Sequence, residues 1–314
     1  MPEIRKPPAL RNGDAIRILS LASPVEKCLV EKGRAELERL GYIVAMDSQS
    51  ALAQDGYFAG STATRLASLK SALVEAQSRA IFCSRGGYGS NYLLGQLNLE
   101  SVAPKILLGH SDITSLQIYL WQKFGWVTFH GPMVASGFAN GAGAANGYDR
   151  ESLLHALAET SEGWSVDLDG ESLIAGSAEG VLLGGCLTLI QTSLGTHWEL
   201  DTRGAILVIE DRGIKPYQLD RALMHLKQAG KFDSIAGVVL GDFPECEAPG
   251  QSEPVKNVAQ RILSPLGIPV VWGAAVGHTS RPMLTLPFGV RARLTAENTA
   301  KGTWLEILEP ACAA

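Results

Sequence analysis

Three short segments carry residue types that could act together in nucleophilic catalysis. Ser111 lies in the segment LLGHSDIT, where an apolar run ends and a helical pattern begins. Glu210 ends the apolar run AILVI, and His278 follows Gly277 in the loop after a third apolar run. A serine hydroxyl becomes a nucleophile when a histidine takes its proton and a carboxylate orients that histidine. The chain order Ser, Glu, His therefore predicts a hydrolase triad.

The segment around Ser111 is open to a second interpretation when it is read alone. Gly109 leaves room for a sharp turn, but Ile113 stands where the second glycine of a GxSxG elbow would be. Serine and aspartate are also frequent helix N-caps, so Ser111 or Asp112 could simply begin the following helix. The distant glutamate, histidine and double glycine favour the catalytic interpretation.

The double glycine belongs to the segment SRGGYGSN, directly after the apolar run AIFC. Adjacent glycines at the carboxyl end of a strand let backbone N–H groups approach a ligand, as an oxyanion hole requires. Arg85 of this segment could bind a carboxylate through two parallel hydrogen bonds, as could Arg212 and Arg281. A tight turn and ordinary salt bridges remain the structural alternatives for these residues.

The rest of the sequence carries no metal or dithiol motif. The five cysteines are far apart without a CxxC pair, and neither HExxH nor a carboxylate pair at ligand spacing occurs. We therefore expect that the protein lies in a reducing compartment, where its cysteines stay as thiols, and that it uses no cofactor.

Strand-like and helix-like patterns alternate in the first half, which predicts an α/β fold with a mostly parallel sheet covered on both faces. The expected strands are 15–21, 41–46, 80–83, 105–108 and 126–129, and the expected helices are 25–40, 62–76, 90–97 and 112–124. Ligands of such folds bind at the carboxyl ends of the strands, where the segments described above lie.

The second half is predicted to be mixed α and β. Its expected strands are 180–183, 205–209, 235–240 and 269–272 with a hairpin of 290–295 and 303–307, and its expected helices are 186–194, 217–229 and 255–266. Between the halves the chain is glycine-rich and then acidic and weakly periodic. We predict an N-terminal domain 1–145, a linker 146–178 and a C-terminal domain 179–314.

Composition limits the partners. The 314 residues include 46% hydrophobic and 19% charged side chains, and the formal net charge is −5. This charge argues against a broad basic surface for nucleic acid or anionic lipid. The polar, proline-rich N-terminus lacks the apolar core of a secretory signal, and no apolar run is long enough to span a bilayer. These features predict a cytoplasmic protein that binds neither nucleic acid nor membrane.

Seven blocks occur together in an order and spacing that resemble the LD-carboxypeptidase family of serine peptidases, which includes the microcin C self-immunity peptidases. They are SRGGYGS, GHSD, HGP at 130–132, GGCLTLI at 184–190, EDRGIKPYQLDR at 210–221, GH at 277–278 and LPFG at 286–289. The resemblance implies a flavodoxin-like or amidotransferase-like N-terminal domain with its own type of C-terminal domain, commonly as a homodimer.

The resemblance also implies residue roles and a reaction. The nucleophile maps onto Ser111, the acid onto Glu210 and the base onto His278, with an oxyanion hole from the backbone amides of Gly86 and Asp112. Cytosolic members of this family remove the terminal D-alanine of a murein tetrapeptide during cell-wall recycling, and they use no cofactor. A muropeptide is therefore the expected substrate.

Two alternatives remain open at this point. One is a microcin-immunity-like peptidase that cleaves a toxic aminoacyl nucleotide, for which an aromatic side chain such as Trp164 or Trp198 would stack on the base. The other is a non-catalytic binding protein in which Ser111 is only a helix cap.

Overall fold

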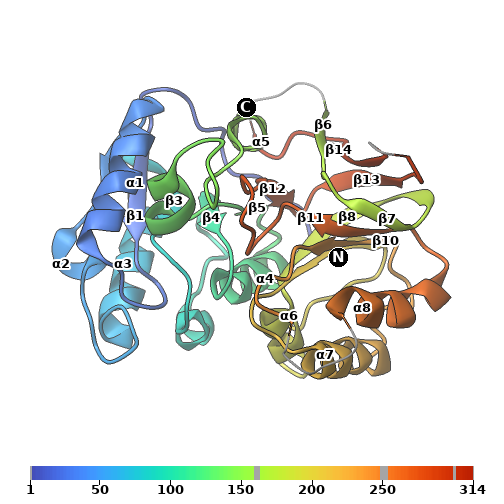
Figure 1. Ribbon diagram of the computed structural model, residues 1–314. Helices are drawn as coiled ribbons and strands as arrows, with labels where there is room; N and C mark the ends of the chain where they lie inside the picture. The colour runs from blue at the N-terminus through green and yellow to red at the C-terminus, as the bar shows by residue number, and fades with distance from the viewer. Residues whose placement is uncertain (1, 159–162, 248–253, 300–301, 314) are drawn as a thin grey trace.

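The protein folds into two lobes that lie side by side, each built on one β-sheet (Figure 1). This computed structural model describes residues 2–158, 163–247, 254–299 and 302–313. No helix within these ranges is long and apolar enough to cross a bilayer.

The first lobe is a six-stranded sheet of order β12-β5-β4-β3-β1-β2, in which all neighbours pair in parallel except β12 with β5. Its strands are β1 (Ala15–Leu19), β2 (Ile43–Ala45), β3 (Ser78–Cys83), β4 (Ile106–Gly109), β5 (Thr128–His130) and β12 (Leu286–Phe288). Its helices are α1 (Lys27–Arg39), α2 (Ser48–Ala51), α3 (Thr62–Val74) and α4 (Ile113–Phe124).

The second lobe is an eight-stranded mixed sheet of order β6-β14-β13-β8-β9-β10-β11-β7, in which β8 to β11 are parallel. Its strands are β6 (Trp164–Asp167), β7 (Glu171–Ile174), β8 (Gly176–Cys186), β9 (Ala205–Glu210), β10 (Gly237–Gly241), β11 (Val270–Ala274), β13 (Arg291–Ala296) and β14 (Thr303–Ile307). Its helices are α6 (Leu187–Ser193), α7 (Pro216–Gln228) and α8 (Val255–Leu263). The predicted fold class is confirmed.

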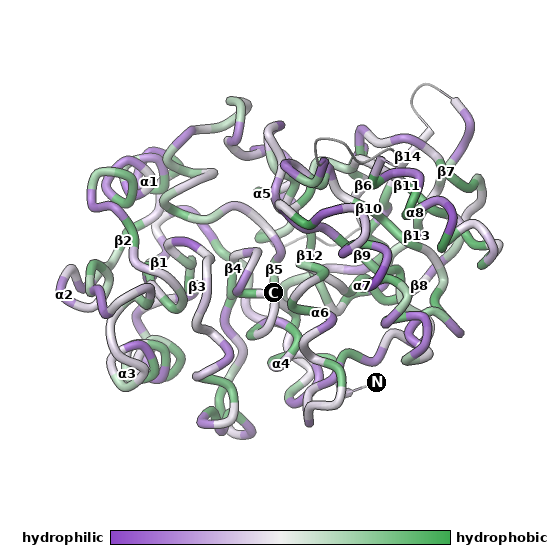
Figure 2. Tube along the Cα trace, turned by 60° about the horizontal axis from the view of Figure 1, so that its bottom comes forward, coloured by the Kyte–Doolittle hydropathy of each residue, from purple (hydrophilic) through white to green (hydrophobic). Residues whose placement is uncertain are grey.

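Strand β12 comes from the second half of the chain but completes the sheet of the first lobe. It pairs with β5 through Leu286–His130 and Phe288–Thr128. One apolar cluster accordingly runs through both lobes, from Ile18 of β1 to Val208 of β9. Figure 2 shows β5 and β12 next to each other in the middle of the molecule, where β12 also contacts β8 of the second sheet. The catalytic candidates of the two halves are thus held across a shared core.

The segment predicted as a linker, 146–178, has regular structure over much of its described length. It contains helix α5 (Arg150–Leu157), which packs against β12, together with β6, β7 and the start of β8. Residues 159–162 of the segment lie outside the described residues. Its periodicity is weak because β6 and β7 are short edge strands of the second sheet, which bury only part of their side chains.

One further local prediction differs from the structure, and one element was not predicted. The predicted helix 90–97 consists of two short 3₁₀ helices, Ser90–Tyr92 and Leu94–Gln96. Gly89, at φ 136°, begins the first of them, and its carbonyl accepts from Tyr92 N at 3.3 Å and from the buried Arg65 at 2.7 Å. A π-helix, Val134–Phe138, follows β5 and packs on α1, with Gly33 leaving room for the Val134 carbonyl.

Candidate active site

Ser111 occupies a strained turn between β4 and α4. Its φ of 61° lies in the left-handed region, which costs a non-glycine residue about 1–2 kcal/mol. Its Oγ has no hydrogen-bond partner among the described residues, whereas its carbonyl accepts from Thr114 N at 2.9 Å. The side chain is half-buried at the rim of the sheet and does not cap α4.

Asp112 precedes α4, but its side chain is directed away from the helix amides. Its Oδ2 accepts a hydrogen bond from Ser90 N at 2.8 Å, and Ser90 Oγ donates to the Asp112 carbonyl at 2.7 Å. Burial raises the pKa of Asp112, although the hydrogen bonds from Ser90 act to lower it. Asp112 thus occupies the N-cap position of α4, but neither it nor Ser111 caps the helix through its side chain, and Asp112 ties the serine turn to the glycine loop.

The missing second glycine of the elbow has a local explanation. A Cβ at Gly109 would lie 3.2 Å from both γ-carbons of Ile113, so the single glycine makes the space that the isoleucine fills. On the opposite side, a Cβ at Gly86 would lie 2.7 Å from Ser111 Cβ and 3.4 Å from Asp112 N. The glycine loop after β3 therefore lies directly against the serine.

Arg65 holds that loop from within the protein, a role that the sequence did not indicate. Its side chain is 1% exposed and donates to the carbonyls of Leu21 at 2.9 Å and Gly89 at 2.7 Å. An arginine at a helical position normally suggests a solvated face, so only the folded loop reveals this function.

Glu210 and His278 form a hydrogen-bonded pair. His278 Nδ1 lies 2.6 Å from Glu210 Oε2, and the backbone N–H of His278 donates to the same oxygen at 3.0 Å. Glu210 is fully buried at the end of β9. Gly277, at φ 63°, is required here because a Cβ on it would overlap the Glu210 carboxyl group.

The electrostatics of the pair favour a carboxylate beside a basic imidazole. Burial would raise the pKa of Glu210, but the charge and hydrogen bond of His278, with the nearby His130 and His110, bring this pKa below its usual value. Burial would lower the pKa of His278, but Glu210 raises it above its usual value. Burial lowers the pKa of His110 to about 3 and that of His130 to about 4. Of these three histidines, His278 is the proton acceptor near neutral pH.

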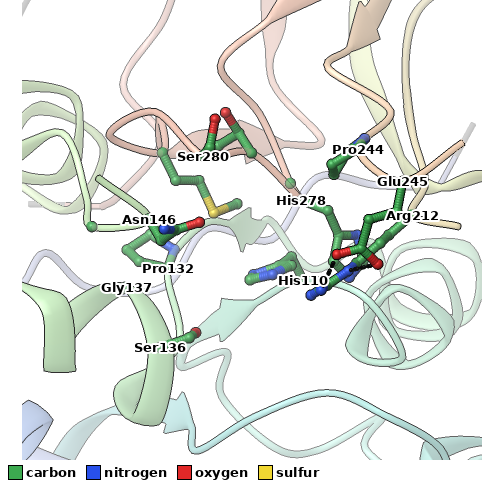
Figure 3. Close-up of a pocket in the computed structure, with 14 residues that line it drawn as sticks. His110, Pro132, Ser136, Gly137, Asn146, Arg212, Pro244, Glu245, His278 and Ser280 are labelled. Carbon is green, nitrogen blue, oxygen red and sulfur yellow. Dashed lines mark hydrogen bonds and ion pairs between the residues drawn. The ribbon is translucent and has the colours of Figure 1, made fainter. Parts of the chain in front are cut away.

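Ser111 and His278 line one cavity of about 330 Å³, together with Gly86 and Arg85. A second cavity, of about 340 Å³, adjoins it and shares His278, Arg212 and two other residues with it. Figure 3 shows His278 and the Arg212–Glu245 pair on one side of the second cavity, with Asn146 and Pro132 on the other. The structure therefore brings the predicted serine, histidine, glycine and arginine to one place.

His110 also lines both cavities. Its Nδ1 lies 2.9 Å from the carbonyl oxygen of Gly131, which only accepts, so the proton is on Nδ1. Nε2 of His110 is consequently an unprotonated acceptor. The His110 and His278 rings meet edge to face, with their centroids 5.2 Å apart.

Asn146 is a second cavity residue that the sequence did not single out. It begins the segment predicted as a linker, but Asn146 N donates to Ser280 O at 2.8 Å, and Asn140 donates to Asn146 O at 2.9 Å. Neighbouring Tyr148 bridges to Met283. The contacts with Ser280 and Met283 join residues far apart in sequence, which no local pattern records.

The three candidate arginines have different partners. Arg212 forms a two-armed pair with Glu245 at 2.9 and 2.5 Å, and Arg281 binds Asp242 at 2.6 Å and Asp169 at 2.9 Å. Arg85 donates one hydrogen bond, to the carbonyl of Pro24 at 3.0 Å, and has no carboxylate partner among the described residues. Arg85 is thus the cation of the serine cavity that is free to bind an anion.

No group of histidine, cysteine, aspartate or glutamate with metal-binding geometry occurs among the residues that the structure describes. The remaining histidines have ordinary surroundings: His155 stacks on Trp164, and His225 contacts Gln191.

Comparison with known proteins assigns the chain to a family. Residues 16–131 match the LD-carboxypeptidase N-terminal domain, and residues 179–294 match the LD-carboxypeptidase C-terminal domain. The chain belongs to the LD-carboxypeptidase family. A probable murein peptide carboxypeptidase of Bacillus subtilis is 35% identical over 94% of this chain and 93% of its own length.

Solved structures of LD-carboxypeptidase relatives have the same fold. Muramoyltetrapeptide carboxypeptidase from Oxalobacter formigenes superposes with a TM-score of 0.82 at 29% identity, over 94% of this chain and 99% of that one. The microcin C7 self-immunity protein MccF, in complex with glutamyl sulfamoyl guanosine, superposes with a TM-score of 0.87 at 24% identity, over 98% and 99%. Family membership makes this chain a peptidase of the carboxypeptidase type.

Proposed function

We propose that the protein is a serine LD-carboxypeptidase that releases the terminal D-alanine of a murein tetrapeptide. The observation that carries the proposal is the buried Glu210–His278 pair, which lines one cavity with the strained and unpartnered Ser111. The substrate class follows the family and its murein-peptide relatives. We also propose that the enzyme is a cytoplasmic homodimer that takes part in cell-wall recycling and requires no cofactor.

The mechanism assigns one role to each member of the triad. Ser111 Oγ attacks the carbonyl of the bond between the L-centre of diaminopimelate and D-alanine while His278 takes its proton. Glu210 accepts the Nδ1–H of His278, which leaves Nε2 as the base, and it stabilises the imidazolium that forms. His278 then protonates the leaving amine, and water repeats the cycle on the acyl-enzyme.

The oxyanion hole is proposed to consist of the backbone amides of Gly86 and Asp112. Both positions adjoin Ser111, as the 2.7 and 3.4 Å contacts of a Gly86 Cβ indicate. The Ser90–Asp112 hydrogen bonds would keep the two amides in a fixed relation before substrate binds.

Gly86→Ala is expected to lower kcat about 100-fold, because a Cβ 2.9 Å from Ser111 Oγ must displace the nucleophile. Gly95→Ala is the matched control, since a Cβ at Gly95 meets nothing within 4 Å. D-alanine release by both variants, with circular dichroism to verify folding, measures the effect. Equal rates for Gly86→Ala and Gly95→Ala would contradict this placement of the loop.

Arg85 is proposed to bind the terminal carboxylate of the substrate. Arg85→Ala should lower kcat/KM for the free tetrapeptide about 10- to 100-fold, the value of a hydrogen-bonded charge pair, and should leave a C-terminally amidated analogue little affected. Arg212→Ala is the comparison variant, because Glu245 already occupies that guanidinium. If Arg212→Ala, and not Arg85→Ala, removed the preference for the free acid, the anchor would be Arg212.

The pH dependence of kcat/KM should show the pKa of the catalytic base, His278, on its acid side. Because Glu210 raises the pKa of His278 above its ordinary 6.5, we expect kcat/KM to fall as pH drops through a value above 6.5. The loss occurs on the acid side because protonated His278 accepts no proton from Ser111. The pH dependence of D-alanine release measures this, and a limb centred below 6.5 would contradict the assignment.

The alternative is cleavage of an aminoacyl nucleotide, since the MccF structure contains glutamyl sulfamoyl guanosine. The two aromatic candidates for base stacking lie elsewhere: Trp164 is buried beside His155, and Trp198 packs on Tyr119. Neither lines the two cavities, nor does any other described tryptophan, tyrosine or phenylalanine. This lining favours a peptide substrate.

Product analysis distinguishes the two reactions. The enzyme is incubated with murein tetrapeptides containing diaminopimelate or lysine and with an aminoacyl sulfamoyl nucleotide, and the products are identified by mass spectrometry. D-Alanine release from a tetrapeptide is expected, and cleavage of the nucleotide analogue alone would overturn the proposal.

A further inference from the structure

His130 lies at the junction of the two lobes and has no part in the mechanism above. It ends β5, where it pairs with Gly109 of β4 on one side and Leu286 of β12 on the other. Its ring stacks on Phe288 with centroids 5.2 Å apart and is fully buried. The backbone of His130 is therefore held between the strand that presents Ser111 and the strand that crosses from the second half of the chain.

Two polar groups face each other here without a hydrogen bond between them. Neither ring nitrogen of His130 has a partner among the described residues, and Glu210 Oε1 also has none. His130 Nε2 lies 3.9 Å from Glu210 Oε1, about 1 Å beyond hydrogen-bond distance. A buried polar atom without a partner costs about 1–3 kcal/mol, so both groups gain free energy if this gap closes.

We propose that His130 is a positioning residue whose Nε2–H donates a hydrogen bond to Glu210 Oε1 during turnover. Glu210 would then bind His278 through one oxygen and His130 through the other. The inference rests on the proposed function, because it assigns the second oxygen of the proposed catalytic acid.

The bond would act on the basicity of His278. A hydrogen bond to Oε1 spreads the charge of the carboxylate, and this stabilises Glu210 most when His278 is neutral and leaves that charge uncompensated. Loss of the bond therefore raises the pKa of His278. His130 is neutral near pH 7, since burial lowers its pKa to about 4, so it donates without adding a charge. The other titratable groups that face this cluster are His110, Cys186, Asp211, Arg212 and Glu245.

Two substitutions at position 130 separate positioning from packing. His130→Gln retains an N–H group at the place of Nε2, whereas His130→Asn retains one only at the place of Nδ1. We expect His130→Asn to move the acid limb of kcat/KM to higher pH by about one unit, the effect of losing a hydrogen bond to a charged group. His130→Gln should keep the wild-type limb. His130→Phe, which keeps the stacking on Phe288, should shift like His130→Asn.

The position of the acid limb of kcat/KM tests the inference, and it can be compared among folded variants even where their stabilities differ. Equal limbs in wild type and all folded variants, or equal shifts in His130→Gln and His130→Asn, would overturn the inference. Failure of the proposed function is distinguishable, because Ser111→Ala would then retain activity.

A measurement on the wild-type protein needs no variant. In enzyme labelled with ¹⁵N-histidine and modified at Ser111 with a fluorophosphonate, we expect the proton of His130 on Nε2. A proton on Nδ1 with an unprotonated Nε2 would leave no donor toward Glu210 and would overturn the inference.

Discussion

Ser111→Ala is expected to lower kcat for D-alanine release by on the order of 10⁶-fold, the loss seen when the nucleophile of a serine triad is removed. The strained turn at φ 61° points this side chain into the cavity beside His278, and the other hydroxyl that lines this cavity, Ser136 Oγ, donates to the Met133 carbonyl at 3.5 Å. We therefore expect no other hydroxyl to replace it. Residual turnover would come from binding and the oxyanion donors alone. Rates are measured by quantifying D-alanine under single-turnover conditions.

Ser115→Ala is the matched control for this substitution. Ser115 lies one turn further along α4 and is buried away from both cavities, so its removal tests helix integrity without touching the proposed nucleophile. Its kcat should stay near that of the wild type. Wild-type rates in the folded Ser111→Ala variant would exclude an acyl-enzyme on this serine.

Glu210→Gln carries the second largest expected effect, a loss of kcat on the order of 10⁴-fold, as for the corresponding aspartate-to-asparagine change in other serine triads. The substitution preserves volume in a fully buried site. A side-chain amide, however, offers an N–H where Oε2 now accepts from His278 at 2.6 Å, which favours the wrong tautomer of the imidazole. Steady-state kinetics of folded protein measure the loss.

Asp211→Asn distinguishes catalysis from structure at the neighbouring position. Asp211 Oδ2 accepts from Thr188 N at 3.0 Å and from Thr188 Oγ1 at 2.7 Å, and so fixes the start of α6. Its replacement should cost about 1–3 kcal/mol of unfolding free energy and little turnover. If Asp211→Asn lost as much kcat as Glu210→Gln, the acid of the triad would have to be reassigned.

Much of the fold follows from local sequence patterns. The strand AILVI and the helix that ends at Phe124 each have an uninterrupted hydrophobic pattern. The ends of both elements agree with the predicted ends to within one residue. The candidate residues Ser111, Glu210 and His278 were recognised because each follows a strand, where side chains of parallel sheets gather. The pairing of Glu210 with His278 is visible only in the structure.

What the sequence did not predict depends on distant contacts. Strand β12 has three residues and is specified by its pairing with β5, not by its own pattern. Asn146 lines a cavity because Ser280 binds its backbone, and Arg65 is buried because the loop carbonyls of Leu21 and Gly89 surround it. A periodicity argument contains none of these partners.

Titration of Ser111 with a fluorophosphonate tests the central claim most directly. Enzyme is modified to increasing extents, the modified residue is mapped by mass spectrometry, and D-alanine release from murein tetrapeptide is measured on the same samples. We predict one modified residue, Ser111, and activity that falls in proportion to its modification. Full D-alanine release from enzyme that is completely modified at Ser111 would contradict the account.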